Sequence, residues 1–577
     1  MAIADTFEPG QGFMAKQVEG ALRIQRERRV ILADQPGAGK TLQAILACEL
    51  DGLFDRRSNI LILCNVTGCQ LTWSPEIKKR IATQYDIVFA DLTDTRGRKT
   101  MPSLQQRDDH LATSLIDADD TARPLIALAN YEQLRWQIRK APKVPTLWEI
   151  EWDAVIIDEA HLVLPTTVDK EEKLTQFWYG LGGLQYRNRL CGLCGEPHHP
   201  TDHDEDDFPG RRFSYREYTP IQLPISGTPD RGKLENRYGY WKWFWPTSHT
   251  DFLSWASGQF VITWEEVGWD RQRNRPTKVP VIGKLRHPDQ WAFYDRQHVI
   301  RRTKQEMWVG MPEKIWPEGG GVDIPLTPTQ QQAYDDYLDE LEAKEQELIE
   351  LGDEQAASAL RLRFALRGRQ MATATWDWVT TIGDDGREHE TGTPKLLGRD
   401  GSSKLAWLLD WMEARGYTAE NWDPTQGKVV IVSFFTEVLK WLQLELRSEG
   451  IESEILAGDT PLMEKQRIEG AFQRGGLRVV LLQGYLGVSI NLDAADDMIF
   501  MDLVHDPDRI EQAEDRIHRA SRMHHAFYWR LVAVGTIDQA TVELVDARYK
   551  TTRASYDGSR GIEFARRMLG ATPRGAR

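Results

Sequence analysis

The chain has 577 residues, of which 41% are hydrophobic and 28% charged, and its formal net charge is −15. This length is enough for roughly three or four domains. No run approaches the ~20 apolar residues that span a bilayer, the first residues lack a secretion signal, and five cysteines are too few for a disulfide framework. We therefore expect an intracellular protein, cytoplasmic or nucleoid-associated. Because its net charge is negative, any contact with nucleic acid should be confined to local basic patches.

Residues 13–25 have the apolar spacing of a helix and carry Gln17 shortly before a glycine-rich segment. A side-chain amide can read an adenine edge through one donor and one acceptor. The alternative is an ordinary surface glutamine.

The segment 29–46, RVILADQPGAGKTLQAIL, is an apolar run broken by a proline and two glycines before helical spacing resumes. It predicts a phosphate-binding loop: glycines turn backbone amides toward an anion, the lysine reaches the outer phosphates, and the threonine hydroxyl serves magnesium. The residues of this loop are Gly37, Ala38, Gly39, Lys40 and Thr41. Asp34 stands where the general pattern has a small residue, and in this the loop resembles the variant form of helicase superfamily two.

Apolar strand patterns followed by helical patterns recur at residues 59–65, 124–135 and 153–163. This alternation predicts a doubly wound parallel sheet, which binds ligands at the carboxyl ends of its strands. Asp158 and Glu159 follow four apolar residues and therefore lie at that edge. Asp158 can hold magnesium, and Glu159 can polarise a water for attack on the γ-phosphate. The alternative is a helix cap.

Residues 186–213 contain a Cys-x-x-Cys pair and several histidines, and a tetrahedral zinc would supply the folding energy that such a core-poor loop lacks. The four expected ligands are Cys191, Cys194, His199 and His203. The alternative is a polar insertion without metal.

The segment 221–229 resumes the strand pattern and ends in Ser-Gly-Thr-Pro, which we interpret as a γ-phosphate sensor or, alternatively, a simple turn.

Residues 236–270 are rich in tryptophan at helical spacing, which favours a helical core over base stacking. Residues 324–351 predict an exposed charged helix, and the glycine-rich residues 380–404 predict a loop or linker.

A second alternating segment begins near Lys404, with strand patterns at 426–451 and 478–502. The stretch that follows places four polar residues at helical intervals: Gln512, Arg516, Arg519 and Arg522. Arg516 and Arg519 are three residues apart and would share a helix face, suited to neutralise charge on a transferring phosphoryl group. The alternative is a solvated basic face.

With these motifs in order, the sequence resembles the Swi/Snf family of ATP-dependent DNA translocases in helicase superfamily two. The resemblance runs from about Phe13 to about Ala547 and is carried by DQPGAGKT, ANYEQL, IIDEAH, ISGTP, RRTK, TPTQQQAY, SSKLAWLLDWM, VIVSFF, AGDT, INLDAAD, QAEDRIHR and GTID.

The resemblance implies two RecA-like lobes that track along double-stranded DNA, with ATP and Mg²⁺ as cofactors. Zn²⁺ in the insertion is expected from the spacing of its cysteines and histidines alone. It makes Gln17 an adenine reader, places Gln512 at the nucleotide, and makes Arg516 and Arg519 arginine fingers. It also places Thr67, Tyr131 and Ser433 near motifs that contact the DNA backbone.

We therefore expect an α/β protein, monomeric, with helical insertions. Its expected parts are a first lobe at 1–325 (including the zinc insertion 186–213 and a helical aromatic insertion 232–300), a helical insertion and linker at 326–400, a second lobe at 401–547 and a basic tail at 548–577. The expected function is ATP-driven movement along double-stranded DNA. A strand-separating or branch-migrating helicase and a non-hydrolysing, ATP-gated binding module are the alternatives.

Overall fold

The computed structural model describes residues 15–65, 68–81, 86–88, 104–131, 133–134, 146–164, 176–191, 215–230, 233–249, 251–270, 275–308, 311–317, 321–351, 360, 366–382, 388–417, 427–486, 490–519, 522 and 524–556. The chain divides into two compact units, one of Met1–Val309 with Thr552–Arg577 and one of Gly310–Thr551. Each unit contains a parallel sheet with helices, so the predicted class of two doubly wound, RecA-like α/β domains is confirmed. No helix in the described parts is long and apolar enough to cross a membrane.

The sheet of the first unit runs in the order β10-β6-β2-β4-β3, and all its pairs are parallel. Its strands are β2 (Asn59–Cys64), β3 (Asp86–Val88), β4 (Leu125–Asn130), β6 (Ala154–Ile157) and β10 (Ile221–Pro224). The short strand β1 (Ile31–Leu32) pairs with β13 (Val299–Ile300), and isolated bridges join this pair to β10. The chain therefore places the segment after residue 300 beside the glycine-rich loop that follows β1.

Alternate residues of each central strand enter different cores, which is why these strands read as continuous apolar runs. In β2, Ile60 and Ile62 pack with one cluster, whereas Leu61 and Leu63 pack with the other. The first cluster includes side chains from α1 (Ala15–Glu27), α2 (Lys40–Leu50) and α4 (Ser74–Arg80), and the second includes side chains from α5 (Leu104–Thr121), α8 (Gln176–Gly182) and α9 (Arg237–Phe244). The sheet is thus covered on both faces.

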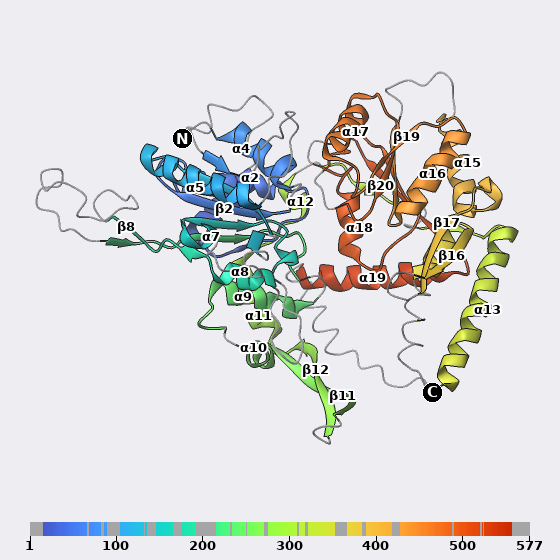
Figure 1. Cartoon of the computed structure of the whole chain (residues 1–577), viewed down its shortest axis with the longest axis horizontal. Coiled ribbons are helices and arrows are strands. Elements are labelled where there is room, and N and C mark those ends of the chain that lie inside the picture. The colour runs from blue at the N-terminus through green and yellow to red at the C-terminus, as the bar shows by residue number, and fades with distance from the viewer. Residues whose placement is uncertain are drawn as a thin grey trace, which may run out of the picture. The chain divides into compact units, whose positions relative to one another are not determined.

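The tryptophan-rich segment is helical only in its first part. Aromatic residues of α9, among them Tyr240 and Phe244, are buried, which confirms the core interpretation for this helix. After α10 (Phe252–Gln259), an antiparallel ribbon of β11 (Phe260–Asp270) and β12 (Arg275–Leu285) extends from the body of the unit, before α11 (Pro288–His298) (Figure 1). The expectation of an entirely helical insertion is wrong because the run Phe260–Trp264 is β-branched and aromatic, which favours a strand.

The sheet of the second unit runs in the order β14-β22-β21-β18-β20-β19, with β15 also paired to β22. Its strands are β14 (Lys314–Ile315), β15 (Val322–Ile324), β18 (Val429–Ser433), β19 (Ser453–Leu456), β20 (Val479–Gln483), β21 (Asp497–Phe500) and β22 (Ala526–Ala533). Its main helices are α13 (Pro328–Glu350), α15 (Ser403–Ala414), α16 (Thr436–Ser448), α17 (Leu462–Arg474) and α18 (Pro507–Glu514). Because β14 and β15 belong to this sheet, the second unit includes residues N-terminal to position 325.

The predicted loop at residues 380–404 contains regular structure. Strands β16 (Trp376–Ile382) and β17 (Glu388–Pro394) form an antiparallel ribbon. The residues Val379–Ile382 are β-branched, and Trp376 stacks on Trp378 with ring centroids 5.1 Å apart. Local β propensity and this aromatic pair outweigh the glycines around them.

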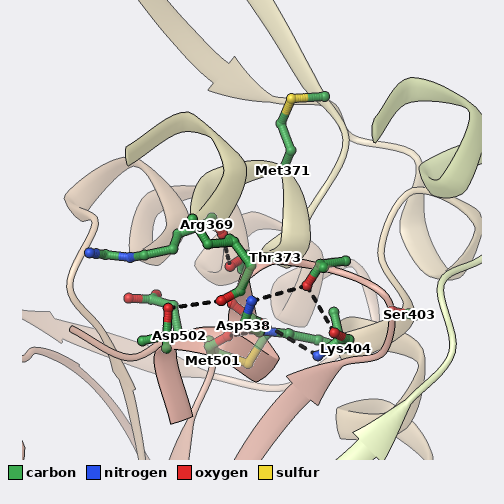
Figure 2. A network of polar contacts seen from close by, with 12 residues as sticks. Arg369, Met371, Thr373, Ser403, Lys404, Met501, Asp502 and Asp538 are labelled. Atoms are coloured by element: carbon green, nitrogen blue, oxygen red, sulfur yellow. Dashed lines mark hydrogen bonds and ion pairs between the residues drawn. The ribbon is translucent and has the colours of Figure 1, made fainter. Parts of the chain in front are cut away.

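A buried polar network ties α15 to the sheet of the second unit. Figure 2 shows the Lys404 ammonium between Met501 and Asp538: it donates to the Met501 carbonyl at 2.6 Å and to Asp538 Oδ2 at 2.5 Å. The same Asp538 oxygen accepts the backbone N–H of Ala533. Beside it, the Ser402 hydroxyl caps α15 and donates to the Thr373 carbonyl. Lys404 lies in SSKL and Asp538 in GTID, so this pair joins two of the sequence motifs.

We expect Lys404→Met to lower the free energy of unfolding of this unit by about 3–5 kcal/mol, because it leaves the buried Asp538 carboxylate without its partner. Urea denaturation measures the change. Lys344→Met is the matched control, since the Lys344–Glu340 pair on α13 is exposed at both ends and should contribute well under about 1 kcal/mol. Equal losses in the two variants would contradict the assigned importance of the buried pair.

Candidate functional site

The glycine-rich loop lies between β1 and α2, at the carboxyl end of the parallel strands. Gly37 and Gly39 have φ angles of 81° and 73°, a region that side-chain-bearing residues rarely adopt. Gly39 is also the N-cap of α2. The Gln17 amide donates to the Ala38 carbonyl at 3.4 Å, so helix α1 brings the predicted adenine reader to the loop itself. The predicted succession of a strand, a glycine-rich turn and a helix matches this geometry.

Lys40 is the first residue of α2, and Thr41 is the second. The Lys40 ammonium donates to the carbonyls of Asp34 and Gln35 at 2.8 and 3.1 Å, which holds it over the loop. Burial lowers the pKa of Lys40, and the nearby carboxylates of Glu159, Asp34 and Asp158 oppose that shift. The lysine of the loop and the two acids after β6 therefore share one electrostatic environment.

Asp34 is completely buried and forms a charged cluster behind the loop. Its carboxylate accepts from the Arg302 guanidinium at 2.6 and 3.1 Å and from the Gln43 amide at 3.0 Å. Arg302 also donates to Gln43 Oε1 and to the Lys16 carbonyl. The unusual acid at the first loop position is thus the partner of an arginine in the RRTK motif. Sequence reasoning singled out both motifs but did not connect them; their opposite charges were the available signal.

The neighbouring Arg301 fixes a second contact to the loop. Its Nη1 donates to the carbonyls of Ala33 and Gly227 at 2.5 and 2.6 Å. A Cβ at Gly227 would lie 2.9 Å from Pro36, so glycine is required for the close approach of the Ser-Gly-Thr-Pro turn to the loop. This turn, predicted as a phosphate sensor, therefore packs directly on the phosphate loop.

Asp158 and Glu159 follow β6 at the same edge of the sheet. Asp158 Oδ2 accepts from the Trp73 indole at 2.9 Å, its Oδ1 accepts from the Glu159 backbone N–H, and its carbonyl accepts from the Tyr131 hydroxyl. Burial, together with the adjacent Glu159 charge, raises the pKa of Asp158 to about 6. A carboxyl group held at a cost to its charged form is suited to a cation that stabilises that charge.

Glu159 has a left-handed backbone, with φ of 46° and ψ of 45°, which is uncommon outside glycine and asparagine and is found at functional sites. Its carboxylate lies 3.3 Å from His161 Nδ1. The same His161 nitrogen is 2.9 Å from the Ser226 hydroxyl. A continuous polar chain therefore runs from Glu159 to the turn that contacts the phosphate loop.

The pKa of Asp158 has a measurable consequence for stability. A carboxyl whose pKa is raised on folding is protonated preferentially by the folded state, so stability is lost as pH rises from about 4 to about 6. We expect Asp158→Asn, which keeps an acceptor for Trp73, to be more stable than the parent at pH 7.5 without nucleotide or magnesium, with the gain fading toward pH 4. Urea denaturation across pH measures it, with the exposed Asp120→Asn on α5 as control. A loss of stability at pH 7.5 would contradict the assignment.

In the second unit, the predicted helix carrying the two arginines ends too early. Gln512 lies in α18, but this helix stops at Glu514. Arg516 lies in the turn that follows, and Arg519 lies in the irregular segment after that turn. The expectation that they share a helix face is wrong. Both guanidinium groups instead bind backbone carbonyls of neighbouring positions in the chain. Arg516 donates to the Leu486 carbonyl at 2.9 Å, and Arg519 donates to the Ile490 carbonyl at 2.8 Å. Burial lowers the pKa of Arg519.

The turn is anchored by buried charges that sequence reasoning missed. Lys314 of β14 donates to Glu514 at 2.9 Å and to Asp515 at 3.1 Å, immediately before Arg516. The two carboxylates raise the pKa of Lys314 against the effect of burial. The Arg516 carbonyl accepts from the Leu492 backbone N–H, which fixes the other end. Arg516 therefore lies in a well-anchored turn, and Arg519 follows that turn.

The remaining predicted residues have mixed outcomes. Cys191 is buried in β8 (Arg189–Cys191), paired with β9 (Tyr215–Glu217), while Cys194, His199, His203 and Thr67 lie outside the described residues. The described part of the chain contains no group of three or more potential metal-ligating side chains. Tyr131 is buried against Asp158, and Ser433 is buried with its hydroxyl on Asp502.

Comparison with known proteins identifies two matching domain families in this chain. Residues 16–197 match the model of the SNF2-related domain, and residues 413–521 match that of the helicase conserved C-terminal domain. The chain is 21% identical over 553 residues to the chromatin structure-remodeling complex protein SYD of Arabidopsis thaliana, covering 93% of this chain and 13% of that protein. It is 22% identical to the RNA polymerase-associated protein RapA of Erwinia tasmaniensis, covering 92% and 49%.

A relative from Caenorhabditis elegans, the SWI/SNF-related matrix-associated actin-dependent regulator of chromatin subfamily A containing DEAD/H box 1 homolog, is 25% identical over 292 residues. That match covers 46% of this chain and 29% of the relative, so the chain spans less than a third of this relative and of SYD, and about half of RapA. The solved Sulfolobus solfataricus SWI2/SNF2 ATPase core in complex with dsDNA aligns over 96% of this chain and 94% of that one, at 17% identity and a TM-score of 0.33. The two matching domains, the motifs and the relatives together support a Swi/Snf-type ATPase of helicase superfamily two.

Proposed function

We propose that this protein hydrolyses ATP in response to double-stranded DNA and uses the cycle to move along the duplex and remodel DNA or protein–DNA complexes. The observation that carries the proposal is the gathering of Lys40, Asp158 and Glu159 at one sheet edge, with Lys40 held over a glycine loop. This is the set of groups that phosphoryl transfer requires: a cation for phosphate charge, a metal ligand and a residue that orients water.

The residues present fit ATP with Mg²⁺. The loop amides and Lys40 would hold the phosphates, Gln17 would read the adenine, and Thr41 and Asp158 would hold the metal, which supplies neutralisation of phosphate charge when bound. The raised pKa of Asp158 is consistent with a cation-binding role. The charged cluster of Asp34 and Arg302 keeps the loop in shape, so its donors need little reorganisation.

Glu159 accepts the proton of the attacking water in this proposal. Its left-handed backbone sets the carboxylate beside His161, and His161 contacts Ser226, so the same groups can report whether a phosphate is present. Arg516 and Arg519 are assigned as arginine fingers that stabilise charge on the transferred phosphoryl group, and Gln512 as a further nucleotide contact. The roles of Arg516 and Arg519 are supported by the family resemblance, because the shared helix face that we first expected is not present.

Zinc binding by Cys191, Cys194, His199 and His203 stays a separate proposal, which metal analysis of the purified protein tests directly. Stoichiometric zinc that is lost in Cys194→Ser supports it, and protein without zinc after purification under metal-replete conditions overturns it.

Strand displacement experiments separate translocation from unwinding. A translocating protein should displace the third strand of a DNA triplex in an ATP-dependent manner while leaving a forked duplex intact. Separation of the fork would favour the strand-separating helicase instead. Lys40→Ala is the negative control in both assays, and triplex displacement by this variant at the parental rate would overturn the proposal.

A further inference from the structure

Two thiols are in contact directly behind the candidate site. Cys64 is the last residue of β2, and Cys69 begins the π-helix η1 (Cys69–Trp73). Their Sγ atoms are 2.9 Å apart, and both side chains are buried, with relative exposures of 1% and 2%. A disulfide bond is about 2.05 Å long, so the sulfurs need to approach by only about 0.9 Å. We propose that Cys64 and Cys69 form an oxidisable dithiol that low-molecular-weight disulfides convert to an intramolecular disulfide.

Hydrogen bonds made by residues next to the two cysteines already hold the cysteines close together. The Cys69 backbone N–H donates to the Asn65 carbonyl at 3.0 Å, and the Gly68 backbone N–H donates to the Asn65 side chain at 2.6 Å. Disulfide formation therefore joins groups that the folded chain holds in place, and little conformational entropy is lost.

The dithiol is connected to Asp158 through a single short element. Trp73, the last residue of η1, is fully buried and donates its indole N–H to Asp158 Oδ2 at 2.9 Å. A movement of Cys69 toward Cys64 displaces the start of this five-residue π-helix. Single π turns are rare and occur frequently at functional sites. Oxidation should therefore alter the position of Trp73 and, through it, the Asp158 carboxylate.

The chemistry is ordinary thiol–disulfide exchange. One protein thiolate attacks a sulfur of oxidised glutathione and forms a mixed disulfide, releasing one glutathione thiolate; the second protein thiolate then attacks the protein sulfur of that mixed disulfide and releases the second. Two protein thiols are oxidised by two electrons, one glutathione disulfide is reduced to two thiols, and the released thiolates take up the protons. Burial raises the pKa of Cys64, so the exchange requires local opening and should be slow.

The functional part of the inference rests on the proposed ATPase activity. We expect the disulfide to lower kcat for ATP hydrolysis at least about tenfold, because displacements of this size at a catalytic group have effects of that order. Dithiothreitol should restore the rate.

The test incubates the full chain with oxidised glutathione, blocks remaining thiols with an alkylating reagent, and maps linked peptides by mass spectrometry before and after dithiothreitol. We expect a Cys64–Cys69 link and a parallel fall in ATPase rate. Cys64→Ser and Cys69→Ser should form no such link and keep their rate under oxidation. Cys48→Ser, which removes a thiol that is equally buried in α2, should behave as the parent.

The two parts fail separately. If no Cys64–Cys69 link forms, or if links form only through other cysteines, the proposal of an oxidisable dithiol is wrong. Formation of the link with an unchanged rate overturns its connection to Asp158. If the reduced parent hydrolyses no ATP, the proposed function fails, while the peptide map still decides whether the disulfide forms.

Discussion

Glu159→Gln should reduce kcat for ATP hydrolysis by about 10²–10⁴-fold, because the substitution keeps the shape of the side chain but removes the group that accepts a proton from the attacking water. ATP binding should be nearly unchanged, since the glycine loop and Lys40 are intact. Steady-state hydrolysis together with equilibrium binding of a labelled nucleotide measures the two effects separately.

Glu151→Gln is the matched control, because Glu151 is exposed and immediately precedes the same strand-and-acid segment. It should hydrolyse ATP at the parental rate. A Glu159→Gln protein that also retained the parental rate would show that another group activates the water, and the assignment of Glu159 would be wrong.

Asp34→Ala should destabilise the first unit by about 3–5 kcal/mol and weaken nucleotide binding. The reason is that Arg302, 13% exposed, would lose its carboxylate partner in a buried cluster that also orders Gln43 behind the loop. The general P-loop pattern has a small residue at this position, so a prediction from that pattern alone has the opposite sign. Urea denaturation and nucleotide titration measure the two losses.

Asp55→Ala, at an exposed position of the same unit, is the control and should change stability by less than about 0.5 kcal/mol. The double variant Asp34→Ala with Arg302→Met should recover part of the loss, because it removes both buried charges. Unchanged stability in Asp34→Ala would mean that the cluster does not support the loop.

The sequence was most informative where a local pattern determines the structure. The strand around Ile60–Leu63 is apolar on both faces because both faces are covered, and Gly37 and Gly39 are required by their backbone angles. These features led directly to two parallel sheets and to the edge at which Lys40, Asp158 and Glu159 lie.

The sequence was least informative where distant residues meet or where local propensities compete. Arg302 and Asp34 are separated by 268 positions, and no periodicity relates them. The sequence analysis did not predict the ribbons β11–β12 and β16–β17, although both contain β-branched runs. In the first ribbon, tryptophans at helical spacing favoured a helix. In the second, nearby glycines favoured a loop. The spacing of Arg516 and Arg519 predicted that the helix would continue past Glu514. The helix instead ends at Glu514, where Lys314 binds the carboxylates of Glu514 and Asp515.

DNA-driven movement is tested by measuring the ATPase rate in parallel without nucleic acid, with single-stranded DNA, with double-stranded DNA and with RNA. We expect a low basal rate and the largest stimulation with double-stranded DNA, and we expect Lys40→Ala to abolish this stimulation. A rate that is equal in all four conditions, or highest with RNA, would contradict a motor that acts on double-stranded DNA.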